Sequence, residues 1–390
     1  MANMKQFEPA PEPRFVDDDR LDRIRDHLSE TELDAFVAFS PANSYYLSGC
    51  YAGMYSRPVI GVVTASTSAF VAPRLEERKA ERTAWVDTVS VYEDSDDPFD
   101  VLAAAVPESS NRLGYDAAEA RPGWVNELER RLDATFVDAT EEFTALRIVK
   151  TDWELDKIRR AQDLATAGVV AMSETVRSGA SEIEAAAAVQ RAYYDTYLEE
   201  HSEFDIGTAN ELGQYGFASV LSGPHALEPH SISSSREIAD GDSVVGIALP
   251  SIPGYVWEEE RTFLVGDVDE EVEAAMTALA EIREGTIDRV GPGESVAEID
   301  AWTHDRIERA GFGEYVQHRT GHGEGITIHE EPALNAQKDG ELKPGMVISI
   351  EPGLYFHERG NALRHSDTLI VTEDGAERIT GTDAGVLRVD

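Results

Sequence analysis

The densest group of chemically active side chains lies in the segment HRTGHGEGITIHEEP, residues 318–332. It contains three histidines, and its glycines allow the backbone to approach a ligand closely. His322 and His329 are an odd number of residues apart and would face opposite ways on a straight strand. The glycines between them must therefore bend the chain if both rings are to reach one pocket. The segment is not the helical zinc motif H-E-x-x-H, because no second histidine follows at helical spacing and Pro332 would end a helix.

Two further segments supply carboxylates. In ISIEPGLY, Glu351 stands in an apolar strand directly before Pro-Gly, a position that favours a side chain reaching into a site. In GYVWEEERTF, Glu258 and Glu260 would share one face of a strand while Glu259 points away. Two carboxylates on one face need a metal ion, another cation or a proton in order to coexist. The alternative interpretation is a solvated acidic run.

A fourth segment, LSGPHALEPHSI, places His225 and His230 in a Gly/Pro loop after a predicted strand. A histidine in such a loop can accept and return protons near neutral pH. The alternative is an ordinary surface histidine, and the loop alone does not discriminate between the two.

The composition bounds the classes of partner. Of 390 residues, 34 are Lys or Arg and 75 are Asp or Glu, which gives a net charge of −41. Such a chain repels phosphates, so we expect neither nucleic acid nor an anionic membrane as a partner. Many carboxylates with few lysines are typical of a high-salt cytoplasm, where salt screens their mutual repulsion. The alternative is an ordinary acidic protein.

Targeting and redox signals are also few. The single cysteine, Cys50, excludes an internal disulfide and a cysteine-based zinc site. The N-terminal stretch has no apolar core of a signal peptide, and no segment approaches the about 18 apolar residues of a membrane helix. We therefore expect a cytoplasmic protein.

The elements that must position these side chains fall into two domains after a loose arm over residues 1–16. Short β-branched and aromatic runs alternate with helical patterns over 17–150, which predicts an α/β domain. The second domain, 151–390, opens with two S/T-x-x-E capping boxes at Thr151 and Ser181, each followed by a long helix. The helix starts SGASEIEAAAAVQ and PGESVAEIDAW, each followed later by an apolar strand, form a faint repeat. It suggests a duplicated half with a central site; the alternative is a coincidence between two capped helices.

Taken together, the GHG…HEEP, EPGLY and GY…RTF segments resemble the pita-bread superfamily of creatinase, prolidase, Xaa-Pro aminopeptidase and methionine aminopeptidase. The resemblance runs from about residue 20 to the C-terminus. It implies an α/β (α+β) fold with a small creatinase-type N-terminal domain, a duplicated pita-bread C-terminal domain and a homodimer.

The peptidases of this superfamily hold two metal ions with two Asp, one His and two Glu. Carried over by resemblance, the His falls on His322 and one Glu on Glu351. The second Asp falls on Glu258, whereas the first Asp and the last Glu fall on Ile247 and Ser366, which are poor or impossible ligands. The resemblance therefore predicts either no metal or at most one Mn, Co or Zn ion on Glu258, His322 and Glu351, an open three-ligand site.

Creatinase is the branch that works without metal. The resemblance of this chain to creatinase assigns the acid/base histidine to His230 and the two carboxylates of the pocket to Glu260 and Glu351. The loop SGCYAGMYSR resembles the one that grips the carboxylate of the substrate, which implies that Tyr55 and Arg57 bind substrate. A metal-free pocket with two carboxylates would be anionic and would select a guanidinium or ammonium group.

The motif HEEPALN departs from creatinase and keeps the peptidase sequence, in which His329 would stabilise the tetrahedral intermediate. The leading interpretation is a hydrolase of a C–N bond in a small cationic, carboxylate-bearing molecule, metal-independent or mononuclear. One alternative is an Xaa-Pro peptidase with a reduced metal site acting on a short peptide. Another is a non-catalytic binding module on the same fold.

Overall fold

The chain divides into two units between Arg147 and Ile148 in the computed structural model. The structure describes residues 17, 19–52, 57–201, 217–252 and 254–390. Each unit is described by itself below.

The first unit is built on a six-stranded sheet in the order β4-β3-β2-β1-β5-β6. Its strands are β1 (Ala35–Ala38), β2 (Ile60–Thr64), β3 (Ser68–Pro73), β4 (Thr88–Tyr92), β5 (Arg112–Tyr115) and β6 (Thr135–Asp138). Its helices are α1 (Arg20–Ser29), α2 (Pro41–Ser48), α3 (Glu77–Thr83), α4 (Pro98–Ala105), α5 (Pro122–Glu129) and α6 (Thr140–Ile148), whose last residue belongs to the second unit. The strands β1, β2 and β3 are antiparallel and the outer pairs are parallel, with an apolar core centred on Val37, Val62 and Val71.

The second unit begins with two long helices, α7 (Asp152–Thr175) and α8 (Glu182–Glu200). Both start at the predicted capping boxes. The Thr151 hydroxyl accepts a hydrogen bond from the Glu154 backbone N–H and the Glu154 carboxylate accepts one from the Thr151 N–H; Ser181 and Glu184 repeat the arrangement. These reciprocal bonds satisfy backbone donors that a helix start otherwise leaves open.

Two larger sheets, two two-stranded sheets (β10-β9 and β15-β16) and two further α-helices make up the rest of the described part of the second unit. One larger sheet has the order β19-β11-β8-β7, and the other has the order β13-β12-β14-β17-β18. The strands are β7 (Phe217–Ser222), β8 (Ser243–Leu249), β9 (Ser251–Ile252), β10 (Tyr255–Val256), β11 (Glu259–Val265), β12 (Gly321–Gly323), β13 (Glu330–Leu334), β14 (Val347–Ile350), β15 (Gly353–Phe356), β16 (Asn361–Arg364), β17 (Asp367–Val371), β18 (Ala376–Arg378) and β19 (Leu387–Val389). The helices are α9 (Glu270–Ile287) and α10 (Val296–Arg309).

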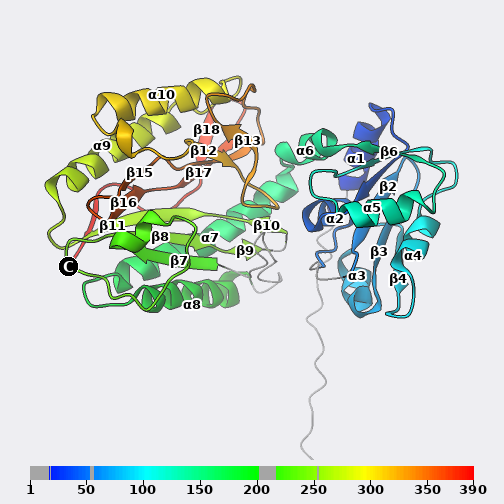
Figure 1. The fold of residues 1–390 in the computed structure, drawn as a ribbon, viewed down its shortest axis with the longest axis horizontal. Coiled ribbons are helices and arrows are strands. Elements are labelled where there is room, and N and C mark those ends of the chain that lie inside the picture. The colour runs from blue at the N-terminus through cyan, green and yellow to red at the C-terminus, as the bar shows by residue number, and fades with distance from the viewer. Residues whose placement is uncertain (1–16, 18, 53–56, 202–216, 253) are drawn as a thin grey trace, which may run out of the picture. The chain divides into compact units, whose positions relative to one another are not determined.

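Within this unit the strands lie between two helical layers, α7 with α8 on one side and α9 with α10 on the other (Figure 1). The two sheets join where the Ser366 N–H, just before β17, donates to the backbone oxygen of Glu260 in β11, at 3.1 Å. The carboxylate-bearing segment 258–260 therefore lies against the strands that carry His322 and Glu351.

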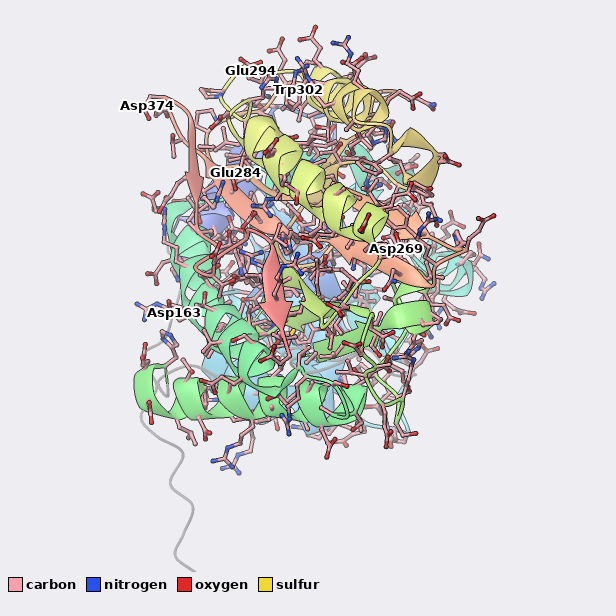
Figure 2. All side chains as sticks on the ribbon, turned by 90° about the vertical axis from the view of Figure 1, so that its left-hand side faces the viewer. Asp163, Asp269, Glu284, Glu294, Trp302 and Asp374 are labelled. Carbon is pink, nitrogen blue, oxygen red and sulfur yellow. The ribbon has the colours of Figure 1, made fainter. Side chains whose placement is uncertain are left out.

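Many carboxylates of the second unit lie on its outer helices and turns. Asp163 on α7, Asp269 at the start of α9, and Glu294 and Asp374 in turns are all exposed (Figure 2). Water solvates such groups at little cost, whereas a buried carboxylate needs a partner. None of the described helices is long and apolar enough to cross a membrane.

Candidate functional site

The site is built on one face of the sheet that contains β12, β14 and β17. In this sheet His322 pairs with Ser349, and Ser349 pairs with Thr368. Side chains of directly paired residues point to the same face, and residues two positions along the same strand share that face. Glu351 and Ser366 therefore join them, and the Ser349 and Ser366 hydroxyls lie 2.8 Å apart.

Three buried side chains converge on this face. Single ligand atoms of Glu258, His322 and Glu351 all lie within 4.8 Å of one another. The His322 Nε2 atom is 3.2 Å from Oε1 of Glu351 and 3.9 Å from Oε1 of Glu258. The Nδ1–H of His322 donates to the backbone oxygen of Gly323 at 3.1 Å, which directs the second nitrogen toward the carboxylates. Nε2 thus faces both carboxylates and is the atom of His322 that would coordinate a cation in place of its proton.

Electrostatics tie His322 to the two carboxylates. Burial alone would lower the pKa of His322, but the hydrogen bond and charge of Glu351, with that of Glu258, raise it to about 10. Burial raises the pKa of Glu351, yet His322 and Arg364 outweigh it and hold the pKa far below its usual value. Without a metal ion the imidazolium is therefore the cation of this cluster, and an ion must displace its proton to bind.

The geometry does not suit a second ion. Ile247, in β8 opposite Glu260, is buried in an apolar cluster with Leu221, Ile328 and Tyr355. Ser366, at the other altered ligand position, has its hydroxyl 2.9 Å from Oε1 of Glu258 and serves that carboxylate as a hydrogen-bond donor. A pair of ions needs bridging carboxylates. These two positions offer none, so the residues present fit one ion and not two.

Glu260 has a partner that the sequence interpretation missed. Arg364, at the end of β16, makes a bidentate contact with the Glu260 carboxylate, with Nε 2.5 Å from Oε2 and Nη2 2.6 Å from Oε1. Its Nε atom is also 3.9 Å from Oε2 of Glu351. Both members of the pair are buried. The chain therefore supplies its own guanidinium to Glu260, one of the two carboxylates from which a cationic substrate was expected, while the choice of substrate stays a prediction.

The histidines of the two loops lie on the open side of the cluster. The rings of His322 and His329 are 4.4 Å apart, so the chain bends between them as the glycines predicted. The ring of His230, in the loop after β7, lies 6.5 Å from that of His329. Both His230 and His329 are exposed, whereas His225 contacts the buried Glu182 at 2.8 Å and has a structural partner. The structure therefore brings the five predicted residues close together: His230, His329, His322, Glu351 and Glu260. Arg364 links the last two of them.

The two predicted substrate-binding residues belong to the first unit. Tyr55 lies outside the described residues. Arg57 makes a bidentate contact with the exposed Asp94, Nε to Oδ1 and Nη2 to Oδ2, both at 2.8 Å. Its role in gripping a substrate carboxylate stays a prediction.

A second missed residue is Glu324, two positions after His322. It is fully buried, and neither carboxylate oxygen has a hydrogen bond of good geometry to any described residue. Burial, followed by the charge of Glu258, raises its pKa well above the usual value, although His322 and the Thr368 hydroxyl oppose this. The available signal was an acidic residue between two glycines in the segment GHGEG.

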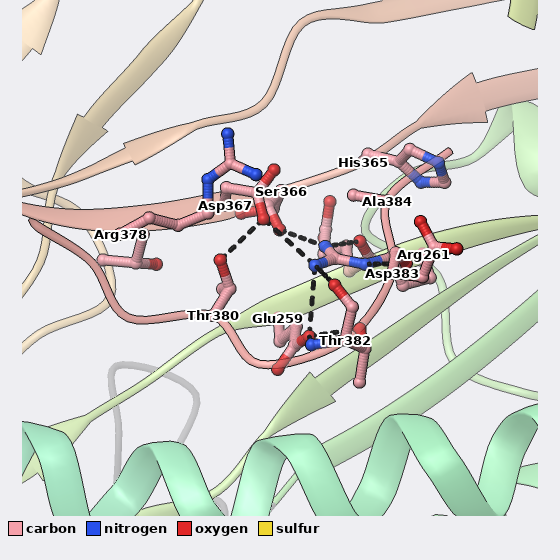
Figure 3. A network of polar contacts seen from close by, with 12 residues as sticks. Glu259, Arg261, His365, Ser366, Asp367, Arg378, Thr380, Thr382, Asp383 and Ala384 are labelled. Atoms are coloured by element: carbon pink, nitrogen blue, oxygen red, sulfur yellow. Dashed lines mark hydrogen bonds and ion pairs between the residues drawn. The ribbon is translucent and has the colours of Figure 1, made fainter. Parts of the chain in front are cut away.

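Behind the site, a buried polar network holds β11 and β17 together (Figure 3). Glu259 points away from the catalytic face, as the strand alternation predicted, and Nη2 of Arg261 lies 3.2 Å from it and 3.0 Å from Asp367. The Thr380 hydroxyl donates to Asp367 at 2.6 Å. These contacts fix the backbone on which Glu258, Glu260 and Ser366 stand.

Two family descriptions match the chain. Residues 20–149 match "Creatinase/Prolidase N-terminal domain", and residues 156–373 match "Metallopeptidase family M24". The Mycobacterium tuberculosis protein named "Probable dipeptidase PepE" is 34% identical over 337 residues, 85% of each chain. The "Xaa-Pro dipeptidase" of Pyrococcus furiosus is 28% identical over 373 residues, 95% of this chain and 99% of that one.

Solved structures agree with the fold. Dipeptidase PepE from Mycobacterium ulcerans matches with a TM-score of 0.79 and 29% identity, over 95% of this chain and 97% of that one. Prolidase from Pyrococcus furiosus matches with a TM-score of 0.77 and 26% identity, over 92% and 99%. The predicted fold class, a creatinase-type N-terminal domain followed by a pita-bread domain, is confirmed.

Proposed function

Because the chain belongs to metallopeptidase family M24 and carries a creatinase/prolidase N-terminal domain, we propose that it is a dipeptidase-type hydrolase of short peptides, Xaa-Pro in kind, with one divalent ion. Relatives named dipeptidase and Xaa-Pro dipeptidase support this substrate class over the creatinase-like reaction that the sequence alone favoured. The chain is a hydrolase of this superfamily rather than a non-catalytic binding module.

The observation that carries the proposal is the convergence of Glu258, His322 and Glu351, with their ligand atoms within 4.8 Å. One imidazole and two carboxylates suit Mn, Co or Zn and leave positions open for substrate. A divalent ion bound there would polarise the carbonyl oxygen of the scissile amide.

The remaining side chains orient and move protons. Arg364 holds Glu260 and attracts Oε2 of Glu351, so Glu351 keeps its Oε1 toward His322. His329 is close enough to His322 to donate a hydrogen bond to the carbonyl oxygen of a substrate bound there. His230, farther out and exposed, holds the proton that the departing nitrogen takes up.

The test is metal content combined with activity. Protein purified at high salt should contain about one equivalent of Mn, Co or Zn, and hydrolysis of Xaa-Pro dipeptides should stop after chelation and return on adding the metal. Glu351→Gln should lose both metal and activity. The matched control is Glu377→Gln, an exposed glutamate on β18 of the same sheet that pairs with Arg159. Two tightly bound equivalents, or full activity after complete chelation, would refute the one-ion proposal.

A second candidate, metal-independent and creatinase-like, is favoured by Ile247 and Ser366 at ligand positions and by the raised pKa of His322. It predicts hydrolysis of creatine-like guanidino acids that chelation leaves unchanged. The homodimer implied by the family resemblance is a further prediction, which light scattering at high salt tests.

A further inference from the structure

In the part of the chain that the structure describes, Glu324 is a buried carboxylate neither of whose oxygens has a hydrogen-bond partner of good geometry. Glu182 accepts from the backbone N–H and hydroxyl groups of Ser222 and Ser234 and contacts His225. Asp116 accepts from two backbone N–H groups and from Asn43, and Asp367 contacts Arg261 and Arg283. Each of these three carboxylates thus has charged or hydrogen-bonding partners, and Glu324 has none of good geometry among the described residues.

The backbone aims Glu324 at the candidate ion site. Its N–H donates to the backbone oxygen of Val347 at 3.0 Å, so the pairing of β12 with β14 continues through this residue. Residues two apart on an extended segment share a face, which places Glu324 on the same side as His322. The charge of Glu258 acts on its carboxyl group more strongly than any other charge does.

The partners of the buried carboxylates on this face set Glu324 apart. Among the described residues, Glu260 pairs with Arg364, Glu258 accepts from two hydroxyl groups, and Glu351 contacts His322 at 3.2 Å. Burying a carboxyl group without a hydrogen-bond partner costs free energy in either protonation state. A cation bound at this face would supply the partner that Glu324 lacks.

We propose that Glu324 is a third carboxylate that strengthens the ion site of Glu258, His322 and Glu351 from beside it. With an ion bound, it supplies the negative charge that the residues at the two altered ligand positions, Ile247 and Ser366, cannot supply. The inference rests on the proposed one-ion hydrolase and deepens it. Glu324 acts on the affinity for the ion and not on the reacting atoms, so it is a positioning residue.

The test pairs metal affinity with the stability of the metal-free protein. Glu324→Gln, with Glu377→Gln as the matched control, is titrated with Mn²⁺ by calorimetry at constant high salt and pH. We expect the wild-type protein to bind one Mn²⁺, and Glu324→Gln to bind it with about 10–100-fold lower affinity. After chelation, the same variant should melt about 2–4 °C higher than the wild type, because folding no longer has to bury an unpartnered carboxyl group that ionises in the unfolded state. The control should change neither quantity.

A structural role and an ion-binding role for Glu324 predict opposite changes in the melting temperature of the chelated variant. A structural carboxylate would lower the melting temperature of the chelated variant and leave Mn²⁺ affinity unchanged, which would overturn the inference. Unchanged affinity in a variant of unchanged stability would overturn it as well, while the one-ion function would survive. A wild-type protein that binds no Mn²⁺ would remove both proposals. Should Glu324→Gln fold poorly, Glu324→Leu, judged by circular dichroism, carries the same two expectations.

Discussion

The buried pair Arg364–Glu260 allows the internal charge balance of the pocket to be measured. The perturbation is Arg364→Met, which keeps the length of the side chain and removes its charge. In the wild type, Nε and Nη2 of the guanidinium donate to the two carboxylate oxygens of Glu260 at 2.5 and 2.6 Å. Burial raises the pKa of Glu260, Arg364 opposes the rise, and Glu258 and Glu351 add to it, giving about 8.

The magnitude follows from the fate of Glu260. In the wild type the folded-state pKa of Glu260 already lies at about 8, above its ordinary value of 4.5, and without Arg364 it should rise further. Removing one partner of a buried pair costs about 3–5 kcal/mol of unfolding free energy, and we expect a loss in this range for Arg364→Met. Because the Glu260 carboxyl group is mainly protonated at pH 7 with or without Arg364, the loss should change little between pH 7 and pH 5.

The assay is urea unfolding at pH 7 and pH 5 at constant salt. It compares the wild type, the single variants Arg364→Met and Glu260→Met, and the double variant that carries both substitutions. The double variant should recover at least half of the loss in free energy of unfolding, because no charge is left unpaired. A loss below about 1 kcal/mol at pH 7 for Arg364→Met, or a loss that differs by more than about 1 kcal/mol between pH 7 and pH 5, would refute the reasoning.

Three further predictions concern single residues. His230→Ala should lower kcat on an Xaa-Pro dipeptide by about 10²–10⁴-fold with an unchanged melting temperature, and near-full turnover would make His230 a bystander. His365 accepts from the Thr262 N–H, and burial lowers its pKa to about 3, so the unfolded state alone takes up its proton as the pH falls from 7 to 5. The wild type should therefore lose about 2 kcal/mol more over this interval than His365→Asn, and equal losses in urea unfolding would contradict this. Arg57→Lys should raise KM several-fold, since lysine does not replace a bidentate fork; an unchanged KM would leave Arg57 only its contact with Asp94.

Much of the fold and half of the site could be predicted because periodicity and local capping are properties of short segments. The capping boxes at Thr151 and Ser181 lie where they were expected, and the alternation of Glu258, Glu259 and Glu260 holds. The bend between His322 and His329 follows from the glycines that separate them. Each of these features depends on fewer than a dozen neighbouring residues.

Arg364 and Glu324 could not be found in the same way, because their roles depend on contacts across the sheets. Arg364 meets Glu260 only because the chain before β17 pairs with β11, 104 residues earlier in the sequence. Periodicity gives the face of a side chain but not its partner on another strand. The omission mattered chemically, since Arg364 offsets part of the negative charge from which a cationic substrate was expected.

The ion-free state of the cluster leads to a last prediction, which separates a catalytic ion from a structural one. His322 carries a proton when no ion is bound, because Glu351 and Glu258 raise its pKa to about 10, and this imidazolium lies 3.2 Å from Glu351. The cluster therefore keeps a cation after chelation, and the polar network of Arg261 and Asp367 behind it contains no group that needs a metal. Chelation should abolish hydrolysis while the circular dichroism spectrum stays that of the folded protein. A structural ion, in contrast, contributes its binding energy directly to folding. Cooperative unfolding on chelation at neutral pH would show that the imidazolium cannot replace the ion.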